Sequence, residues 1–258
     1  MTARKSLRSR IQSQEWLAGS FLNLGSSLSA EIAGQIGFDW LLLDFEHGAG
    51  SDETLLHLLQ AVAATPAAAI VRIAANEPAR FKRVLDLGAA GVMVPYVNTP
   101  DEARAAVAAV RYPPHGVRGV SKFNRAAGFG EDFTRYFAHS SEELVTIVQI
   151  ETAEAVENAE RIAAVDGVDV LFIGPLDLSV NLGVPAQFDS PVLWEAIRKT
   201  ARAAKASNKT AGILLTQPAQ AGTLKELGFS FVALGSDSGA VVSGLKQNLS
   251  ALRNPTGA

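Results

Sequence analysis

Two acidic residues in the middle of the chain have the type and spacing to do chemistry together. Glu151 directly follows the apolar, β-branched run from Val145 to Ile150, and Asp177 lies just beyond a second such run, Asp169 to Ile173. If both runs are parallel strands, their carboxyl ends meet at one edge of a sheet, and the carboxylates lie close together. Two such carboxylates repel each other unless a cation or a shared proton lies between them. The pair is therefore a first indication of a bound metal ion, although each residue could instead cap the helix or turn that follows it.

The residues between these runs support that arrangement. Apolar residues between Ala153 and Val165 recur at the spacing of an amphipathic helix. The 18 residues between Ile150 and Asp169 are enough for the crossover that a parallel β-α-β unit needs. We therefore expect the two strands to be neighbours, with both acidic residues at the same rim of the sheet.

The whole chain alternates short apolar runs with helical patterns, which is typical of a parallel α/β fold. Strands are expected at 17–22, 40–43, 68–73, 91–94, 145–150, 168–173, 210–215 and 231–234. Helices are expected at 28–36, 52–63, 78–87, 99–110, 153–165, 191–206, 219–227 and 240–252. This alternation predicts one domain over residues 1–258, a (β/α)8 TIM barrel. A doubly wound sheet would use fewer strands and carry a glycine fingerprint, and neither G-x-G-x-x-G nor a Walker A motif occurs.

Composition excludes several classes of protein. The net charge of −3 and the scattered Lys and Arg residues give no basic surface for nucleic acid. The chain has no cysteine, so any metal must take oxygen or imidazole ligands. No run of 18 apolar residues is present, and the basic N-terminus lacks the apolar core of a signal peptide. We therefore expect a cytoplasmic protein with no nucleic-acid or membrane partner.

Three segments lie outside the regular alternation. Residues 1–14 form an N-terminal extension, and the expected helix at 240–252 follows the last strand. Residues 112–143 form a long excursion between the fourth helix and fifth strand, with aromatic and basic residues among its glycines and prolines. Loops of this length in compact domains are usually functional, so we expect a lid or a subunit contact rather than disorder.

In a TIM barrel, chemistry takes place at the carboxyl ends of the strands. Polar residues gather at these expected ends from several strands; they are Asp44, Glu46, His47, Arg72, Gln149, Glu151, Asp177 and Asp237. The charge of Arg72 lies among apolar residues and must therefore meet an anion, which could be a partner carboxylate or a substrate. By itself, His47 is better explained as a capped or solvated loop residue than as a catalytic base. Asp86, near the end of a helix, is explained by spacing alone as a surface ion pair with Lys82 or Arg83.

None of the lysines lies on the carboxyl-terminal half of an expected strand. A Schiff-base aldolase requires such a lysine inside the barrel. An oxygen-ligated divalent ion is therefore the electrophile that this chain could use to activate a carbonyl group.

Five segments together resemble the metal-dependent pyruvate aldolases, a family that includes 4-hydroxy-2-oxoheptanedioate, 2-dehydro-3-deoxyglucarate and hydroxypyruvate-using aldolases. They are FDWLLLDFEHG, VRIAANEPARFKRVLDLGAAGVMVPYV, RYPPHGVRGV, VQIETAEAVENAERIAAVDGVDVLFIGPLDLS and FVALGSD. The resemblance covers about residues 15 to 250 and implies reversible aldol chemistry between a pyruvate-type 2-oxo acid and an aldehyde.

The resemblance also implies roles for individual residues. Glu151 and Asp177 correspond to the carboxylates that hold a divalent metal, which oxygen ligands suggest to be Mg²⁺, Mn²⁺ or Co²⁺. Arg72 corresponds to the arginine that stabilises the enolate oxygen. His47 corresponds to the histidine that transfers protons, and the resemblance pairs it with Asp86 in place of the surface ion pair.

Further positions follow from the same resemblance. Asp44 occupies an acidic position near the site, and Gln149 lies where the family has a glutamine near metal and substrate. The backbone around Leu176 and Asp177 would receive the substrate carboxylate. Many family members follow the arginine with proline and a bulky residue, whereas Ile73 to Ala75 follow Arg72 here. The resemblance therefore does not specify the pocket for the aldehyde or the identity of that substrate.

Other readings and the oligomeric state remain to be weighed. An acyl-CoA lyase on a related barrel could use the same carboxylate pair, but it would be expected to carry an additional carboxyl-terminal region. A phosphosugar isomerase would place a phosphate near Asp237, which would repel it, and a non-catalytic binder would not need the full polar rim. The resemblance implies a homo-oligomer, often a hexamer, with the last helix against a neighbour. The apolar face of 241–252 also suits packing on its own barrel.

Overall fold

The computed structural model describes residues 5–254 and shows a closed barrel of eight parallel strands in the order β1 to β8. The strands are β1 (Leu17–Leu22), β2 (Trp40–Asp44), β3 (Ala68–Arg72), β4 (Gly91–Val94), β5 (Val145–Ile150), β6 (Val170–Ile173), β7 (Thr210–Leu215) and β8 (Phe229–Ser236). β8 pairs with β1 and closes the barrel. The predicted TIM barrel is confirmed, and the predicted neighbours β5 and β6 pair in parallel from Ile147 with Val170 to Ile150 with Ile173.

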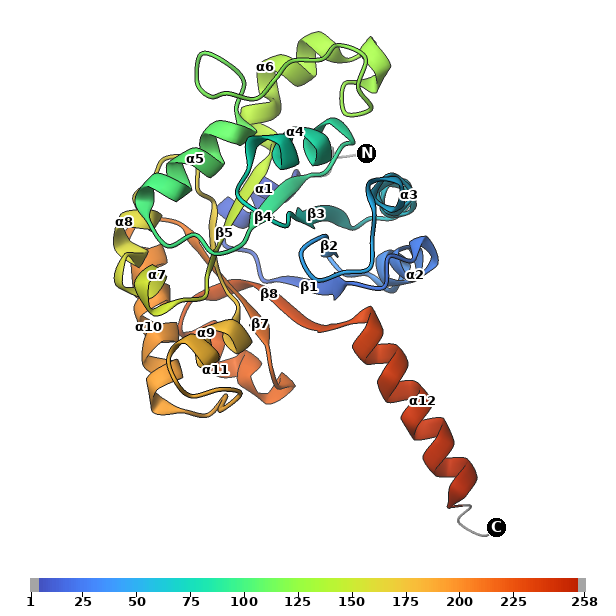
Figure 1. The fold of residues 1–258 in the computed structure, drawn as a ribbon, viewed down its shortest axis with the longest axis vertical. Coiled ribbons are helices and arrows are strands. Elements are labelled where there is room, and N and C mark those ends of the chain that lie inside the picture. The colour runs from blue at the N-terminus through green and yellow to red at the C-terminus, as the bar shows by residue number, and fades with distance from the viewer. Residues whose placement is uncertain (1–4, 255–258) are drawn as a thin grey trace.

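Helices surround the barrel in the order of the chain (Figure 1). They are α1 (Leu7–Gln12), α2 (Ser27–Ile36), α3 (Asp52–Ala63), α4 (Pro78–Asp86), α5 (Pro100–Val110), α6 (Phe133–Glu143), α7 (Ala153–Glu157), α8 (Ala159–Ala163), α9 (Pro175–Asn181), α10 (Pro191–Ala206), α11 (Ala221–Glu226) and α12 (Asp237–Arg253), with 3₁₀ turns η1 (Gly128–Gly130) and η2 (Pro218–Gln220).

The helices differ most from the predictions in five places. The expected helix at 153–165 is divided at Asn158 into α7 and α8. α12 begins at Asp237, earlier than expected, because the Ser236 hydroxyl accepts a hydrogen bond from the Gly239 amide and caps it. The short helices α9 and α1 were not predicted, and the long excursion ends in α6.

Side chains alternate along the strands between the barrel interior and the layer under the helices. Inside the barrel, Trp40 stacks on Phe231 with ring centroids 4.0 Å apart, and Phe172 meets Trp40 edge-on at 6.2 Å. Gly19 makes room for this cluster, since a Cβ there would lie 2.2 Å from the Trp40 ring. These side chains fill the barrel below the carboxyl ends of the strands.

Helix α1 closes the amino-terminal end of the barrel. Its Leu7 and Ile11 side chains join the interior apolar cluster, and Arg8 bonds to Asp169, which directly precedes β6, at 2.8 Å. The sequence pattern placed Asp169 in the strand, whereas in the structure it lies in the loop before the strand. The extension that precedes the barrel is, over its described part, a plug of the amino-terminal end.

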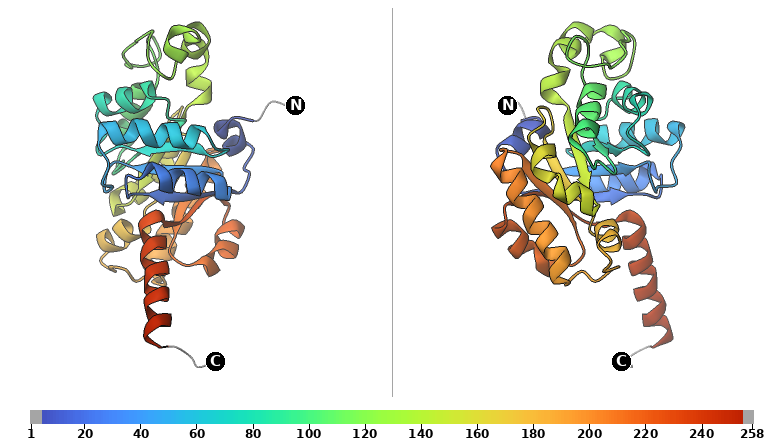
Figure 2. Two further views of the ribbon diagram at one scale, coloured as in Figure 1. Left: turned by 90° about the vertical axis from the view of Figure 1, so that its right-hand side faces the viewer. Right: turned by 60° about the vertical axis from the view of Figure 1, so that its left-hand side comes forward.

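Two parts of the molecule project from the barrel. α6 and the loop before it form a lobe at one end, and α12 extends away from the other (Figures 1 and 2). α12 buries none of its 17 residues, and Leu245 and Leu252 are 63% and 80% exposed. No helix within residues 5–254 is long and apolar enough to cross a membrane.

Candidate active site

The charged core of the site comes from the ends of β2 and β3, which are paired in register at Asp44 and Arg72. Arg72 donates from Nε to Asp44 Oδ1 at 2.9 Å and from Nη2 to Oδ2 at 2.7 Å, while its Nη1 lies 3.0 Å from Glu46 Oε2. The Phe21 ring lies against the guanidinium, with 5.4 Å between its centroid and Cζ. Arg72 does meet anions, as its burial required, and these are partner carboxylates.

This pairing fixes the charges of the two groups. Burial by itself would raise the pKa of Asp44, but the hydrogen bonds and charge of Arg72 outweigh it and lower that pKa. Burial would lower the pKa of Arg72, and Asp44 and Glu46 raise it instead. Glu46 differs, since burial raises its pKa more than Arg72 lowers it. The site thus holds a fixed ion pair beside a carboxyl group whose pKa is raised.

Glu151 lies at the end of β5 and is almost completely buried, at 2% exposure. The Tyr96 amide donates to its Oε1 at 2.8 Å, and Gln149 Nε2 donates to its Oε2 at 2.9 Å. Gly174 passes close by, since a Cβ there would lie 2.7 Å from Oε2. Burial first, then the charges of Glu46 and Asp177, raise the pKa of Glu151 to about 7, although the Tyr96 hydrogen bond opposes them.

Asp177 lies in the first turn of α9, and not in a loop as the sequence suggested. Its charge contributes to the raised pKa of Glu46, Tyr96 and Glu151, so it lies near these three groups. Leu176, in the same turn, is 54% exposed. We call Asp44, Glu46, Glu151 and Asp177 the carboxylate rim.

The carboxylate rim fits a divalent ion with few protein ligands. Within residues 5–254, no three His, Asp or Glu side chains are arranged as a complete metal cage. One buried oxygen near Glu151, Gln149 Oε1, has no hydrogen-bond partner among the described residues, and Glu46 Oε2 has the ionic contact with Arg72. Mg²⁺ typically keeps several waters and uses one or two carboxylates, so Glu151 and Asp177 with the Gln149 oxygen nearby form a suitable donor set.

His47 lies at the mouth, and its side chain is 66% exposed. Its Nε2 is 3.9 Å from Glu46 Oε1, and its backbone amide bonds to Asp44 Oδ1 at 3.2 Å. The site therefore presents a solvent-accessible imidazole next to the buried carboxylates.

The structure does not bring Asp86 to His47 within one chain. Asp86 ends α4 at the amino-terminal side of the barrel, and its Oδ1 accepts a hydrogen bond from Arg118 Nη2 at 2.8 Å. Arg118 is fully buried between the Tyr112 and Tyr136 rings. The expected pairing with His47 is thus absent from the chain, and so is the ion pair with Lys82 or Arg83, because the long excursion supplies the partner instead.

Two contributors were absent from the predicted site residues. Glu46 was noted at the strand end, but its contact with Arg72 depends on the backbone turn after β2. Tyr96 follows β4 with a backbone φ of 50°, in the left-handed region that non-glycine residues rarely adopt. This conformation aims its amide at Glu151. The Pro-Tyr pair after a strand was the only signal in the sequence, and it is a weak one.

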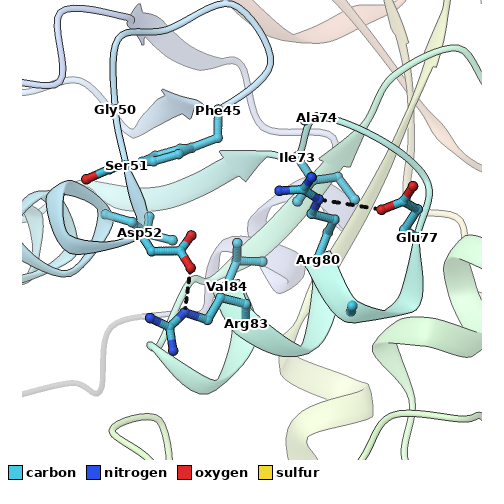
Figure 3. Close-up of a pocket in the computed structure, with 12 residues that line it drawn as sticks. Phe45, Gly50, Ser51, Asp52, Ile73, Ala74, Glu77, Arg80, Arg83 and Val84 are labelled. Carbon is cyan, nitrogen blue, oxygen red and sulfur yellow. Dashed lines mark ion pairs between the residues drawn. The ribbon is translucent and has the colours of Figure 1, made fainter.

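A cleft of about 800 Å³ lies on the outer side of β2 and β3, between α3 and α4 (Figure 3). Phe45 and Ile73 line it, and each is the next residue after inward-facing Asp44 or Arg72. Its charges are internally paired, Arg83 with Asp52 at 3.1 Å and Arg80 with Glu77 at 3.6 Å. The cleft therefore backs onto the site but does not share its excess charge.

Comparison with known proteins agrees with this geometry. The family model described as HpcH/HpaI aldolase/citrate lyase matches residues 17–244. The chain is 41% identical to 5-keto-4-deoxy-D-glucarate aldolase of Salmonella paratyphi C, over 90% of this chain and 91% of that one. It is 44% identical to pyruvate aldolase of Rhizobium etli, over 88% and 89%.

A solved structure shows the same fold. It is an HpcH/HpaI aldolase/citrate lyase family protein from Burkholderia cenocepacia, with a TM-score of 0.91 and 36% identity over 96% of this chain and 99% of that one. The family match, the two aldolases and this structure each cover most of the chain, and the family match includes all four residues of the carboxylate rim. This chain belongs to the HpcH/HpaI aldolase/citrate lyase family of carbon–carbon lyases.

Proposed function

We propose that the protein catalyses the reversible aldol reaction between a pyruvate-type 2-oxo acid, pyruvate or hydroxypyruvate, and an aldehyde. The observation that carries this proposal is the carboxylate rim, in which Arg72 contacts two acidic groups, Asp44 and Glu46, and burial and neighbouring charge raise the pKa of a third, Glu151. The names of the relatives, 5-keto-4-deoxy-D-glucarate aldolase and pyruvate aldolase, support the same reaction class.

Glu151 and Asp177 would hold the divalent ion, which we take to be Mg²⁺, Mn²⁺ or Co²⁺. When bound, such an ion would supply positive charge that acidifies the C3 protons of a 2-oxo acid. Gln149 and the Tyr96 amide keep the Glu151 carboxylate in one orientation. The backbone at Leu176 and Asp177, in the first turn of α9, would receive the substrate carboxylate.

Arg72 would hold the 2-oxo oxygen, on which negative charge develops when C3 loses a proton or when the C3–C4 bond breaks. Asp44 accepts two hydrogen bonds from Arg72 and so fixes the plane of the guanidinium before substrate arrives. Nη1, which faces Glu46, is the guanidinium nitrogen outside that fork.

His47 would move the protons. In cleavage it accepts the proton of the C4 hydroxyl, the C3–C4 bond breaks to release the aldehyde, and the remaining enolate is protonated at C3. In the direction of aldol addition, the same steps run in reverse. Its exposed imidazole at the barrel mouth suits contact with the aldehyde side. Within one chain, the pair with Arg118 holds Asp86 at the other end of the barrel. An Asp86 that took part in this proton transfer would therefore have to come from a neighbouring subunit.

The proposal is tested by H/D exchange at C3 of pyruvate and hydroxypyruvate, followed by proton NMR without any aldehyde. Protein stripped with EDTA should show no exchange, and Mg²⁺, Mn²⁺ or Co²⁺ should restore it. The donor that exchanges faster identifies the preferred 2-oxo acid. Absence of exchange with every metal would remove the aldolase mechanism and would point to the acyl-CoA lyase, which the 41–44% identity to aldolases does not favour.

We further propose that the protein works as a homo-oligomer in which α12 packs against a neighbouring subunit, with a hexamer as the expected assembly. The helix buries no residue on its own barrel, although Val241, Leu245 and Leu249 lie along it with about half or more of their surface exposed. Exposed apolar surface of this extent marks an interaction site. Changing Leu245 and Leu249 together to Lys should lower the molar mass measured by light scattering, whereas an unchanged mass would contradict this role for α12.

A further inference from the structure

Asn23 directly follows β1 and lies in line with the charged core of the site. Strand alternation places Phe21 inside the barrel and Leu22 outside it, so the next residue, Asn23, faces inward again. The register of β1 and β2 pairs Leu22 with Leu43, and one step further sets Asn23 beside Asp44.

The next strand continues the same row. Asp44 pairs in register with Arg72, so Asn23, Asp44 and Arg72 occupy one level on three neighbouring strands. Of these three side chains, Asp44 and Arg72 are hydrogen-bonded to each other. Asn23 is the uncharged member of the row, at the same level as the guanidinium assigned to the 2-oxo oxygen.

The side-chain oxygen of Asn23 has no structural partner among the described residues. This oxygen, Oδ1, is buried and accepts no hydrogen bond within residues 5–254. The backbone needs no help from this side chain, because the Asn23 amide donates to Asp237 Oδ1 at 2.9 Å and its carbonyl accepts from Ala49 at 2.9 Å. A buried amide oxygen without a partner is costly to the folded protein, which favours a role in binding over a role in holding the chain.

We propose, on the basis of the function proposed above, that Asn23 determines substrate choice by hydrogen-bonding a hydroxyl group of the substrate. A hydroxyl both donates and accepts, so it matches either end of a carboxamide. An anionic substituent would be repelled by the neighbouring carboxylate rim, and a methyl group would leave the amide unpaired.

Two substrate hydroxyls could supply this partner. One is the C3 hydroxyl of a hydroxypyruvate-type donor, and the other is a hydroxyl on the carbon next to the carbonyl of the aldehyde. Both hydroxyls would lie beside Asn23 at the carboxyl ends of the strands, near the 2-oxo oxygen that Arg72 would hold. The rotation of the terminal amide about χ2 is broad, so the group can turn toward either position.

The test uses Asn23→Leu, which keeps the shape of the side chain and removes its hydrogen bonds. In the metal-loaded enzyme, one arm compares C3 exchange of hydroxypyruvate with that of pyruvate, without aldehyde. The second arm compares addition of pyruvate to glycolaldehyde with addition to acetaldehyde. Gln12→Leu, which removes an exposed amide at the opposite end of the barrel, is the matched control.

We expect the preference for the hydroxylated substrate to fall about tenfold in one arm for Asn23→Leu and to stay at the wild-type value for Gln12→Leu. A change in the first arm assigns the donor hydroxyl, and a change in the second assigns the acceptor hydroxyl. Because each preference is a ratio within one protein, partial unfolding does not alter it. Unchanged ratios in both arms, or rates that fall equally for every substrate, would overturn the proposal. A wild-type enzyme that exchanges neither donor would instead refute the proposed function.

Discussion

The two ends of the barrel both contain buried charge, but they balance it differently. At the amino-terminal end, Arg8 meets Asp169 at 2.8 Å, Arg10 meets Asp39 at 2.7 Å, and under the long excursion Arg118 meets Asp86 at 2.8 Å. Each of these carboxylates has an arginine close by. At the carboxyl-terminal end, Arg72 contacts two of the four rim carboxylates, Asp44 and Glu46.

The difference separates charges that stabilise the fold from charges that can bind a ligand. Matched pairs at the amino-terminal end tie α1 and the long excursion to the barrel and leave no net demand for an ion. The rim keeps an excess of negative charge that the fold alone does not neutralise, and the raised pKa of Glu151 records the resulting repulsion together with burial. An end of the barrel with unneutralised negative charge is suited to bind a cation and a substrate that accompanies the cation.

The largest expected effect comes from breaking the excess charge itself. Glu151→Ala or Asp177→Ala should reduce metal-dependent C3 exchange by about 10³-fold or more, because each removes a proposed ligand of the ion. Titration calorimetry with Mn²⁺ should show the matching loss of binding. Asp169→Asn, at the other end, serves as the control for removal of one negative charge. Full activity in either alanine variant would contradict the assignment of the site.

A somewhat smaller effect is expected from Arg72→Lys. A lysine keeps the positive charge. It cannot form a two-pronged contact with Asp44 and at the same time donate a hydrogen bond to the substrate oxygen. We expect kcat to fall about 10²-fold, as when one donor to a developing oxyanion is removed, with a circular dichroism spectrum like that of the wild type. Activity within twofold of the wild type would show that Arg72 only neutralises the carboxylates.

At the balanced end, the expected effect is on stability and not on catalysis. Asp169→Ala leaves Arg8 without its carboxylate partner, with only the Ser141 carbonyl to accept from it, and leaves the Thr146 amide without its acceptor, which lies at 2.9 Å. Breaking such a buried pair costs about 3–5 kcal/mol, which urea unfolding would measure. C3 exchange per folded molecule should stay at the wild-type value. A loss of exchange without a loss of stability would mean that the two ends are coupled.

The rim should also reveal itself through pH when no metal is present. The folded pKa of Glu151, about 7, lies above the ordinary value of 4.5. Its contribution to stability is therefore complete below about pH 4.5 and disappears as pH rises through 7, a change of at most about 3 kcal/mol. Unfolding in EDTA should show this decline in the wild type and less of it in Glu151→Gln. Equal slopes in both proteins would show that other groups dominate.

The sequence predicted the barrel and the strand-end residues because both are local. Apolar runs of strand length followed directly by Asp44, Arg72 or Glu151 specify which side chains stand at the carboxyl ends, whatever the loops do. The demand of Arg72 for an anion was equally local, since an unpaired buried charge is costly in any fold.

What the sequence could not provide were contacts set by the irregular segments. Asp86 meets Arg118, 32 residues further along, through an excursion whose path has no periodic pattern. The amide of Tyr96 reaches Glu151 only because its backbone adopts a positive φ. The apolar face of α12 suited either its own barrel or a neighbour, and only the direction in which the helix leaves β8 shows that this face is not buried on its own barrel.

The aromatic cluster below the site gives the barrel a single entrance. With Trp40, Phe172 and Phe231 packed across the interior, nothing can pass from the rim to the amino-terminal end. Whatever enters last through the mouth must therefore leave first. For the proposed cleavage, the 2-oxo acid is held at the level of Arg72 and the aldehyde lies above it. Release would then be ordered, with the aldehyde leaving before the 2-oxo acid, and a high concentration of aldehyde would block the exit of the 2-oxo acid.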